Sequence, residues 1–154
     1  MSPPSNKPWQ QIHAQSPVII QSEKICALKD EKVLLFLPFK ENSIVIPTMV
    51  FIVYYFGTTP FDISAASLDL YIEDTVFSSK NSIPDAFLGN HQDSFSYFSY
   101  NECDAKGLSI EKVLNQPIYL GNNGAQNYSK GDGFIEVTLY SASIDIKKYV
   151  NSGD

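Results

Sequence analysis

The sequence contains no arginine: its eleven basic residues are all lysines, and they face seventeen acidic residues, for a formal net charge of −6. Arginine is the usual bidentate ligand for phosphates, carboxylates and guanine edges. A chain that is acidic overall and has no basic stripe also lacks the electrostatic footprint of a nucleic-acid-binding protein. We therefore expect no nucleic-acid partner and no arginine-clamped anionic substrate.

Long apolar runs and cysteines are also scarce. The longest apolar run, residues 49–56, is eight residues long, whereas a membrane-spanning helix needs about twenty. No basic segment followed by an apolar stretch lies near Met1, so we expect neither a membrane partner nor a secretory signal. The two cysteines, Cys26 and Cys103, form no CxxC motif. We interpret them as buried free thiols, with a single disulfide as the alternative.

What the chain does contain is typical of one globular domain. It has 154 residues, of which 44% are hydrophobic and 18% charged. A disordered acidic chain or a coiled coil would be far richer in charge. A chain of this size buries roughly 70% of its unfolded surface, so it needs no metal or disulfide to stabilise its core.

Motifs for catalysis or metal binding are weak. His13 and His91 lie far apart in the sequence, and a metal site needs three or four convergent ligands. No GxSxG motif is present. The segment Gly131-Asp132-Gly133 lacks the alternating acidic ligands of a calcium loop. We interpret it as a tight turn in which glycine supplies a positive φ.

Four acidic residues can be considered as a carboxylate pair for glycoside hydrolysis, namely Asp62, Asp69, Glu73 and Asp74. Acids at turns and on the solvent faces of strands explain these positions better. We therefore expect no enzyme activity, no cofactor and no metal.

From Pro17 onward, the chain is predicted to form short strands separated by turns rich in Gly, Pro and Asn. No helix longer than two turns is visible, although Ser109 to Leu114 could form one helical turn. This pattern predicts an all-β fold, an antiparallel sandwich that resembles a jelly roll. The expected strands are Val18–Ile20, Val33–Leu37, Ile44–Phe56, Ser67–Ile72, Phe95–Tyr100, Pro117–Leu120 and Phe134–Ile146.

Three of these strands carry finer signals. Pro47 predicts an edge position or a bulge within its strand. Alternation in Ser67–Ile72 predicts a half-buried strand, with Asp69 and Tyr71 on the solvent side. In the last strand, the apolar residues change parity before Ile144, which predicts a bulge there.

The strongest segment, Ile44–Phe56, is apolar at both parities. A sandwich strand needs only one apolar face to form the core. We therefore expect its second face to be covered by another layer or another chain.

Residues 1–16 are predicted to form an extended N-terminal arm, followed by a sandwich domain of residues 17–150. Prolines in this segment oppose both helix formation and strand pairing. Trp9, the single tryptophan, either folds back on its own domain or anchors the arm to a neighbouring subunit, because aromatic anchors concentrate at interfaces. The candidate partner-binding residues of the arm are Pro3, Pro4, Pro8 and Trp9.

The segment SFSYFSY, residues 94–100, is the stretch that best suits a ligand. Stacked aromatics with hydroxyl neighbours suit sugars, so Tyr97 and Tyr100 are candidate ligand-facing residues. Packing in the core or at a subunit interface is the alternative, because tyrosine serves both buried and wet surfaces.

Two blocks, residues 37–62 and 115–146, resemble small β-sandwich proteins found among the virion structural proteins of tailed bacteriophages. In the first block, a Leu-Pro turn leads into a long apolar strand that ends in tyrosines. In the C-terminal block, an Asn-x-Pro strand precedes a Gly-Asp-Gly turn and a strand that ends in Ile-Asp-Ile. These features are Leu37-Pro38, Val53-Tyr54-Tyr55, Asn115-Gln116-Pro117-Ile118, Gly131-Asp132-Gly133 and Ile144-Asp145-Ile146.

The resemblance implies a non-enzymatic virion component: a capsid decoration protein, a head fibre or a tail adaptor. Such proteins are commonly symmetric homo-oligomers, with the trimer favoured, and attach to other capsid or tail proteins through an N-terminal segment. The implied location is the virion, after assembly in the host cytoplasm. The alternative function is a glycan-binding β-sandwich module that recognises a receptor or a cell surface.

Overall fold

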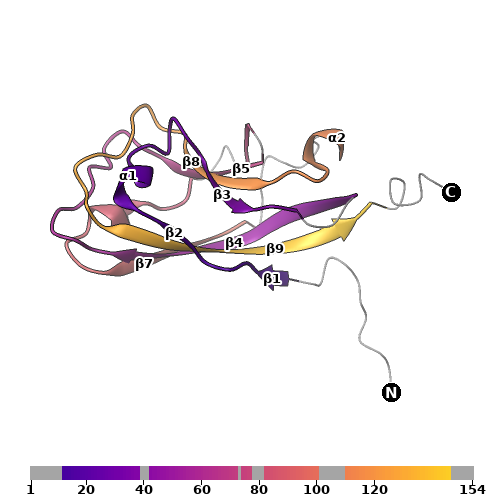
Figure 1. Cartoon of the computed structure of the whole chain (residues 1–154), viewed down its shortest axis with the longest axis horizontal. Helices are drawn as coiled ribbons and strands as arrows, with labels where there is room; N and C mark the ends of the chain where they lie inside the picture. The colour runs from indigo at the N-terminus through magenta and orange to yellow at the C-terminus, as the bar shows by residue number, and fades with distance from the viewer. Residues whose placement is uncertain (1–11, 39–41, 73, 78–81, 101–109, 147–154) are drawn as a thin grey trace, which may run out of the picture.

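The computed structural model describes residues 12–38, 42–72, 74–77, 82–100 and 110–146. Two antiparallel sheets pack face to face around the core (Figure 1). Sheet A contains β1 (Ile12–Ala14), β2 (Val18–Ile20), β9 (Phe134–Asp145), β4 (Ser43–Tyr55) and β7 (Ser94–Ser99). Sheet B runs in the order β3 (Val33–Phe36), β8 (Ile118–Asn122), β5 (Leu68–Ile72) and β6 (Thr75–Val76).

The order of the strands is that of a jelly roll. Strands β1 and β2 pair with successive stretches of β9 and so share one edge of sheet A. With these two counted as one strand, sheet A runs β1/β2–β9–β4–β7 and sheet B runs β3–β8–β5–β6. This is the eight-stranded, double Greek-key arrangement. The predicted all-β, jelly-roll-like sandwich is confirmed.

Each of the seven expected strands is present, with ends within two residues of the expected positions. The helical turn α2 (Ile110–Val113) also lies where it was expected. Sequence reasoning missed β1, β6, the short helix α1 (Ser22–Ile25) and the 3₁₀ turn η2 (Ala86–Gly89). In the described part of the chain, no helix is long and apolar enough to cross a membrane.

The N-terminal boundary of the sandwich requires a correction. Ile12–Ala14 pair with Ala142, Ser141 and Tyr140 of β9, and the Gln15 N–H donates to the Leu139 carbonyl at 2.9 Å. The sandwich therefore already includes Ile12, and the predicted arm of residues 1–16 is too long at its C-terminal end. The prolines that oppose pairing all precede this strand, and the candidate residues Pro3, Pro4, Pro8 and Trp9 lie outside the described residues.

Of the two bulges that the sequence predicts for the long strands of sheet A, the structure contains the one in β4. Pro47 pairs with Ser141 and Met49 with Tyr140, so the extra residue, Thr48, belongs to β4. The bulge expected from Pro47 is confirmed, whereas the bulge expected within the last strand is wrong. The change of register therefore occurs in β4, next to Pro47, which has no N–H to donate to the ladder.

Strand β5 was expected to be half-buried, and this too is wrong. Asp69 is 3% exposed and Tyr71 9% exposed, so both faces of the strand are covered. The Ile83 N–H donates to the Leu68 carbonyl at 2.8 Å in an antiparallel bridge, which places this distant segment beside β5, where the Ser82 hydroxyl reaches Asp69. A local alternation of apolar and polar residues does not reveal a layer that comes from elsewhere in the chain.

The loops at one end of the sandwich, on the left in Figure 1, are joined by hydrogen bonds. The Phe61 N–H donates to the Leu88 carbonyl at 2.9 Å, and the Gln126 N–H donates to the Ala65 carbonyl at 3.0 Å. Asp132 accepts hydrogen bonds from the N–H groups of Thr58 and Thr59, as well as from the Thr58 hydroxyl. These hydrogen bonds tie the loops to one another in a layer at this end of the sandwich.

In this layer, glycine is required because neighbouring atoms approach its Cα closely, and not because its φ is positive. A Cβ on Gly131 would collide with the Phe61 ring, and one on Gly133 would collide with the Tyr55 carbonyl oxygen. The residue with a positive φ in this turn is Lys130, at 69°. The expected turn is present, but the role assigned to its glycines is corrected.

Two fully buried tyrosines yield a matched prediction. The Tyr54 hydroxyl has no hydrogen-bond partner among the described residues, whereas the Tyr128 hydroxyl donates to Asp85 at 2.7 Å. Tyr54→Phe should leave the free energy of unfolding unchanged or raise it by up to about 1 kcal/mol, because it removes a buried polar atom that makes no bond. Tyr128→Phe should lower it by about 1–3 kcal/mol, because Asp85 loses its donor. Denaturant unfolding of both variants measures the difference, and an equal loss in both would contradict the assignment.

Candidate functional site: the outer face of sheet A

Sheet A turns one face toward the core and the other away from sheet B. We call the second one the outer face. Residues paired across antiparallel strands point to the same side. Phe51 pairs with Tyr97 on one side and with Thr138 on the other, and Val53 likewise pairs with Phe95 and Glu136. The intervening residues, such as Ile52, are fully buried in the core.

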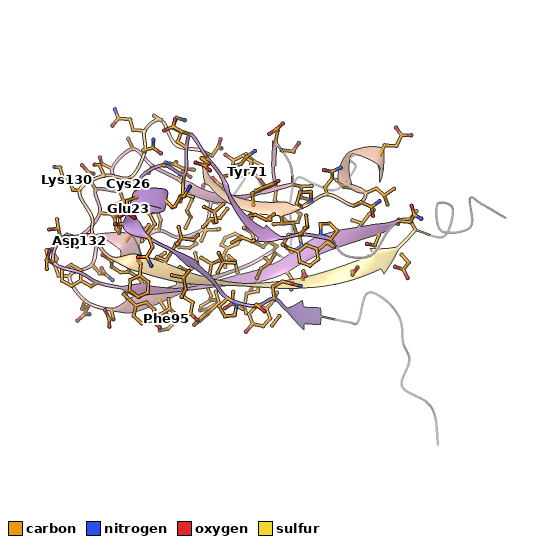
Figure 2. All side chains as sticks on the ribbon, viewed as in Figure 1. Glu23, Cys26, Tyr71, Phe95, Lys130 and Asp132 are labelled. Carbon is orange, nitrogen blue, oxygen red and sulfur yellow. The ribbon has the colours of Figure 1, made fainter. Side chains whose placement is uncertain are left out.

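The outer face is mostly apolar across four adjacent strands. Thirteen residues lie on it between Thr48 and the loop end of the sandwich; ten of them are aliphatic or aromatic, and one carries a charge. The residues are Ala14, Ile19, Met49, Phe51, Val53, Tyr55, Phe95, Tyr97, Ser99, Phe134, Glu136, Thr138 and Tyr140. Ile19, Phe95 and Tyr97 are 57%, 62% and 59% exposed. Figure 2 shows Phe95 on the side of sheet A away from sheet B.

The aromatic rings of this face are already packed against one another. Phe51 and Phe95 stack with centroids 5.7 Å apart and planes at 24°. Tyr55 and Phe134 stack at 4.8 Å and 19°. Rings held by neighbours lose little further freedom when another surface covers them. Strand β4 therefore has a second apolar face, and its coverage by another layer or another chain stays a prediction.

The structure separates the two candidate ligand-facing tyrosines. Tyr97 lies on the outer face, opposite Phe51. The Tyr100 ring instead contacts Phe98 at 4.7 Å and Phe77 at 5.0 Å, both edge-on, and packs against the core cluster. Sequence reasoning omitted Phe95, although its parity matches that of Tyr97 in the alternating segment. The exposed aromatic pair of β7 is therefore Phe95 and Tyr97.

The histidines and cysteines form no cluster with metal-ligand geometry in the described residues. His13 lies in β1, opposite Ser141, and His91 is exposed next to the Phe56 ring at 5.9 Å. Cys26 is a free, half-buried thiol whose pKa is raised, first by burial and then by Glu23. Cys103 lies outside the described residues.

The acidic residues considered for hydrolysis do not form a catalytic pair. Asp62 accepts the Ser64 N–H at 3.0 Å in a turn, which lowers its pKa. Asp74 is exposed and forms an ion pair with Lys32 at 2.9 Å. Glu73 lies outside the described residues. Asp62 and Asp74 thus occupy a turn and a surface position, as expected for acids without a catalytic role.

Asp69 is different because it is buried. Its carboxylate accepts hydrogen bonds from Ser67 Oγ at 3.2 Å and from Ser82 Oγ at 3.4 Å. Desolvation raises its pKa to about 6, although the two hydroxyls oppose the shift. Desolvation also raises the pKa of Asp85, which accepts the Tyr128 hydroxyl. These groups lie in sheet B and the loops, so they control stability rather than the outer face.

Comparison of the chain with protein-family models, with curated proteins and with solved structures finds no match.

The buried carboxyl of Asp69 predicts a pH dependence of stability. Its pKa is about 6 in the folded protein, above the ordinary aspartate value of 3.8, so the folded state holds the proton more tightly than the unfolded chain does. The contribution of Asp69 to stability therefore falls as pH rises from about 4 to 6. Asp69→Asn should raise the free energy of unfolding at pH 7 by about 1 kcal/mol or more and flatten this pH dependence.

Asp62→Asn is the control. Its effect on the pH dependence of the free energy of unfolding should be opposite to that of Asp69→Asn, because the pKa of Asp62 is lowered. Its contribution is present at neutral pH and is lost as pH falls through the folded-state pKa. Urea unfolding over a pH series from about 3.5 to 8 measures both variants across the range in which aspartates titrate. A steeper pH dependence in Asp69→Asn would contradict the assignment.

Proposed function

We propose that this protein is a non-enzymatic structural subunit of a bacteriophage virion, acting as a capsid decoration protein, a head fibre or a tail adaptor. In this proposal, it assembles as a symmetric homo-oligomer and docks on other capsid or tail proteins through its N-terminal segment. The observation that carries the assembly role is the apolar outer face of sheet A. Its location would be the virion, after assembly in the host cytoplasm.

The energetics of the outer face favour an assembly role. Monomeric soluble proteins rarely expose a contiguous apolar patch of this kind. Fully burying one large apolar side chain contributes about 1.5–3 kcal/mol. Phe95, Tyr97 and Ile19 are each more than half exposed, so covering them offers a substantial driving force. A face with one carboxylate among thirteen residues suits a protein surface better than solvent.

The fold and the sequence blocks support the virion setting. Jelly rolls are found in viral capsid proteins and in lectins, so the fold by itself is compatible with both candidate functions. The resemblance of residues 37–62 and 115–146 to virion proteins favours the first. The gene of a virion component is expected to lie among genes for capsid, portal and tail proteins.

The position of β1 supports docking through the N-terminus. Ile12 begins an edge strand of the sheet that carries the outer face, and residues 1–11 directly precede this strand in the sequence. These eleven residues contain Pro3, Pro4, Pro8 and Trp9 and no acidic residue. A proline-rich segment with one large aromatic side chain is well suited to order on a partner surface.

Deletion of residues 1–11 tests this function. The truncated protein should remain a folded oligomer of unchanged stoichiometry, because β1 is retained, but should no longer attach to particles. Light scattering measures the oligomer, and quantitative mass spectrometry of purified virions measures attachment. Equal attachment of the truncated and full-length proteins, or absence of the full-length protein from virions, would refute the proposal.

A glycan-binding module is the second candidate, and the exposed pair Phe95 and Tyr97 favours it. Aromatic rings on an open face can stack against sugar rings. If this function holds, a glycan array probed with the isolated protein should give a signal, and Tyr97→Ala should reduce that signal at least tenfold. Tyr100→Ala is the matched comparison, because the Tyr100 ring packs against Phe77 and Phe98 instead. An array without signal would remove this candidate.

A further inference from the structure

Strand β7 is an edge of sheet A, and its outward-facing backbone groups bond to no other described strand. The Tyr100 N–H donates to the Thr48 carbonyl at 2.9 Å, and the β4–β7 register is regular from there on. Hydrogen-bonded and non-hydrogen-bonded pairs alternate in an antiparallel ladder. The N–H and C=O groups of Phe95, Tyr97 and Ser99 must therefore point away from β4, toward the free edge.

The features that usually prevent strand pairing are charged side chains, prolines, bulges, very short strands and a covering loop. The Pro84 and Phe87 carbonyls accept from the Ser96 and Ser94 hydroxyls, but these two serines pair with the core-facing Ile52 and Tyr54, so the contacts lie on the core side of β7. Strand β7 has the sequence SFSYFS, with no charge and no proline. It also shows no shift of register against β4.

The other sheet edges of the described chain are protected. Pro17 and a change of register separate β1 from β2. Strand β3 has a shift of register between Leu34 and Phe36. Strand β6 is two residues long. Among the described edges, β7 is therefore the one that offers an uninterrupted template for another strand.

We propose that β7 pairs antiparallel with β7 of a second copy of this chain, so that two copies of sheet A join into one continuous sheet. The inference rests on the proposed function in one respect, namely that copies of the chain associate.

Charge favours a second copy at this position. Each chain has a net charge of −6, so two copies repel each other except where their surfaces are uncharged. Strand β7 has no charged residue, and the adjoining outer face has Glu136 alone. Antiparallel self-pairing is also symmetric, so the same three residues satisfy one another with about six hydrogen bonds.

The contact has consequences for the size of the assembly and of the outer face. A contact of one strand from each copy is small compared with a standard interface, so the pair should depend on concentration. It is a two-fold contact and generates two subunits, whereas the resemblance to virion proteins favours three. Pairing also doubles the width of the outer face that is available to a larger structure.

The first test uses the isolated full-length protein. Light scattering over a concentration series should show a monomer in equilibrium with a dimer. Residue-resolved amide exchange should slow at Phe95, Tyr97 and Ser99 as the dimer forms. The amides of Ser96 and Phe98, which face β4, should be protected at all concentrations and serve as the internal control.

The second test compares two charged substitutions on the outer face. Tyr97→Lys places a lysine on the edge strand and should weaken the dimer at least tenfold. Thr138→Lys places the same charge on β9, two strands away from the edge, and should change the dissociation constant less than twofold. Ser99→Pro provides a second edge variant, because it removes an N–H that does not bond to β4. Circular dichroism checks that each variant is folded.

A monomer at all concentrations, a trimer, or an equal effect of Tyr97→Lys and Thr138→Lys would overturn the inference. The last result would indicate packing through the outer face instead. The contact is measured on isolated protein, while the proposed function is measured by attachment to virions. Failure of one is therefore distinguishable from failure of the other.

Discussion

The long antiparallel pair β4–β9 is the element on which the rest of the structure depends. Its pairing runs from Ser43 and Asp145 to Tyr55 and Phe134. One parity of these strands supplies Ile52, Tyr54 and other residues of the core. The other parity supplies the centre of the outer face. A single ladder thus determines both the stability of the sandwich and the surface through which it can associate.

The extra residue at Thr48 lets β4 bury apolar residues of opposite parity on either side of it. Val45 and Val50 differ in parity, yet both are buried, at 6% and 0% exposed. Without a bulge between them, one of the two would point to the outer face. The Thr48 hydroxyl donates to the Tyr140 carbonyl at 3.1 Å, which gives the displaced residue a local partner. The bulge therefore lets two apolar segments of opposite phase share one core.

Much of the fold could be predicted from the sequence because the strands are β-branched and bounded by turn residues. Elements that depend on distant partners could not. Ile12–Ala14 form a strand because β9 extends beyond β2 and offers its edge there. Asp69 is buried where Ser82, from a segment that bridges to the edge of β5, donates to its carboxylate, a contact that local periodicity does not encode. The same distinction applies to the candidate site. The apolar character of β4 at both parities predicted an unsatisfied second face, but only the register places Phe95 and Tyr97 beside Phe51 and Val53. Sequence reasoning also grouped Tyr97 with Tyr100, which the pleat of a regular strand separates onto opposite faces.

The outer face of sheet A and the edge of β7 differ from sheet B and from the loop end in how their apolar and polar groups are covered. On sheet B, the Lys32 ammonium lies 4.8 Å from the centroid of the Tyr71 ring and 5.7 Å from that of Tyr119, and so covers apolar area with a charge. The loop end is tied by hydrogen bonds such as that from the Lys29 N–H to Asn127 at 2.9 Å. The outer face of sheet A, as far as the structure describes it, has neither device, and β7 has no charge at its edge. This contrast is the physical basis of the proposed association, because the face and the edge that lack such protection belong to the same sheet.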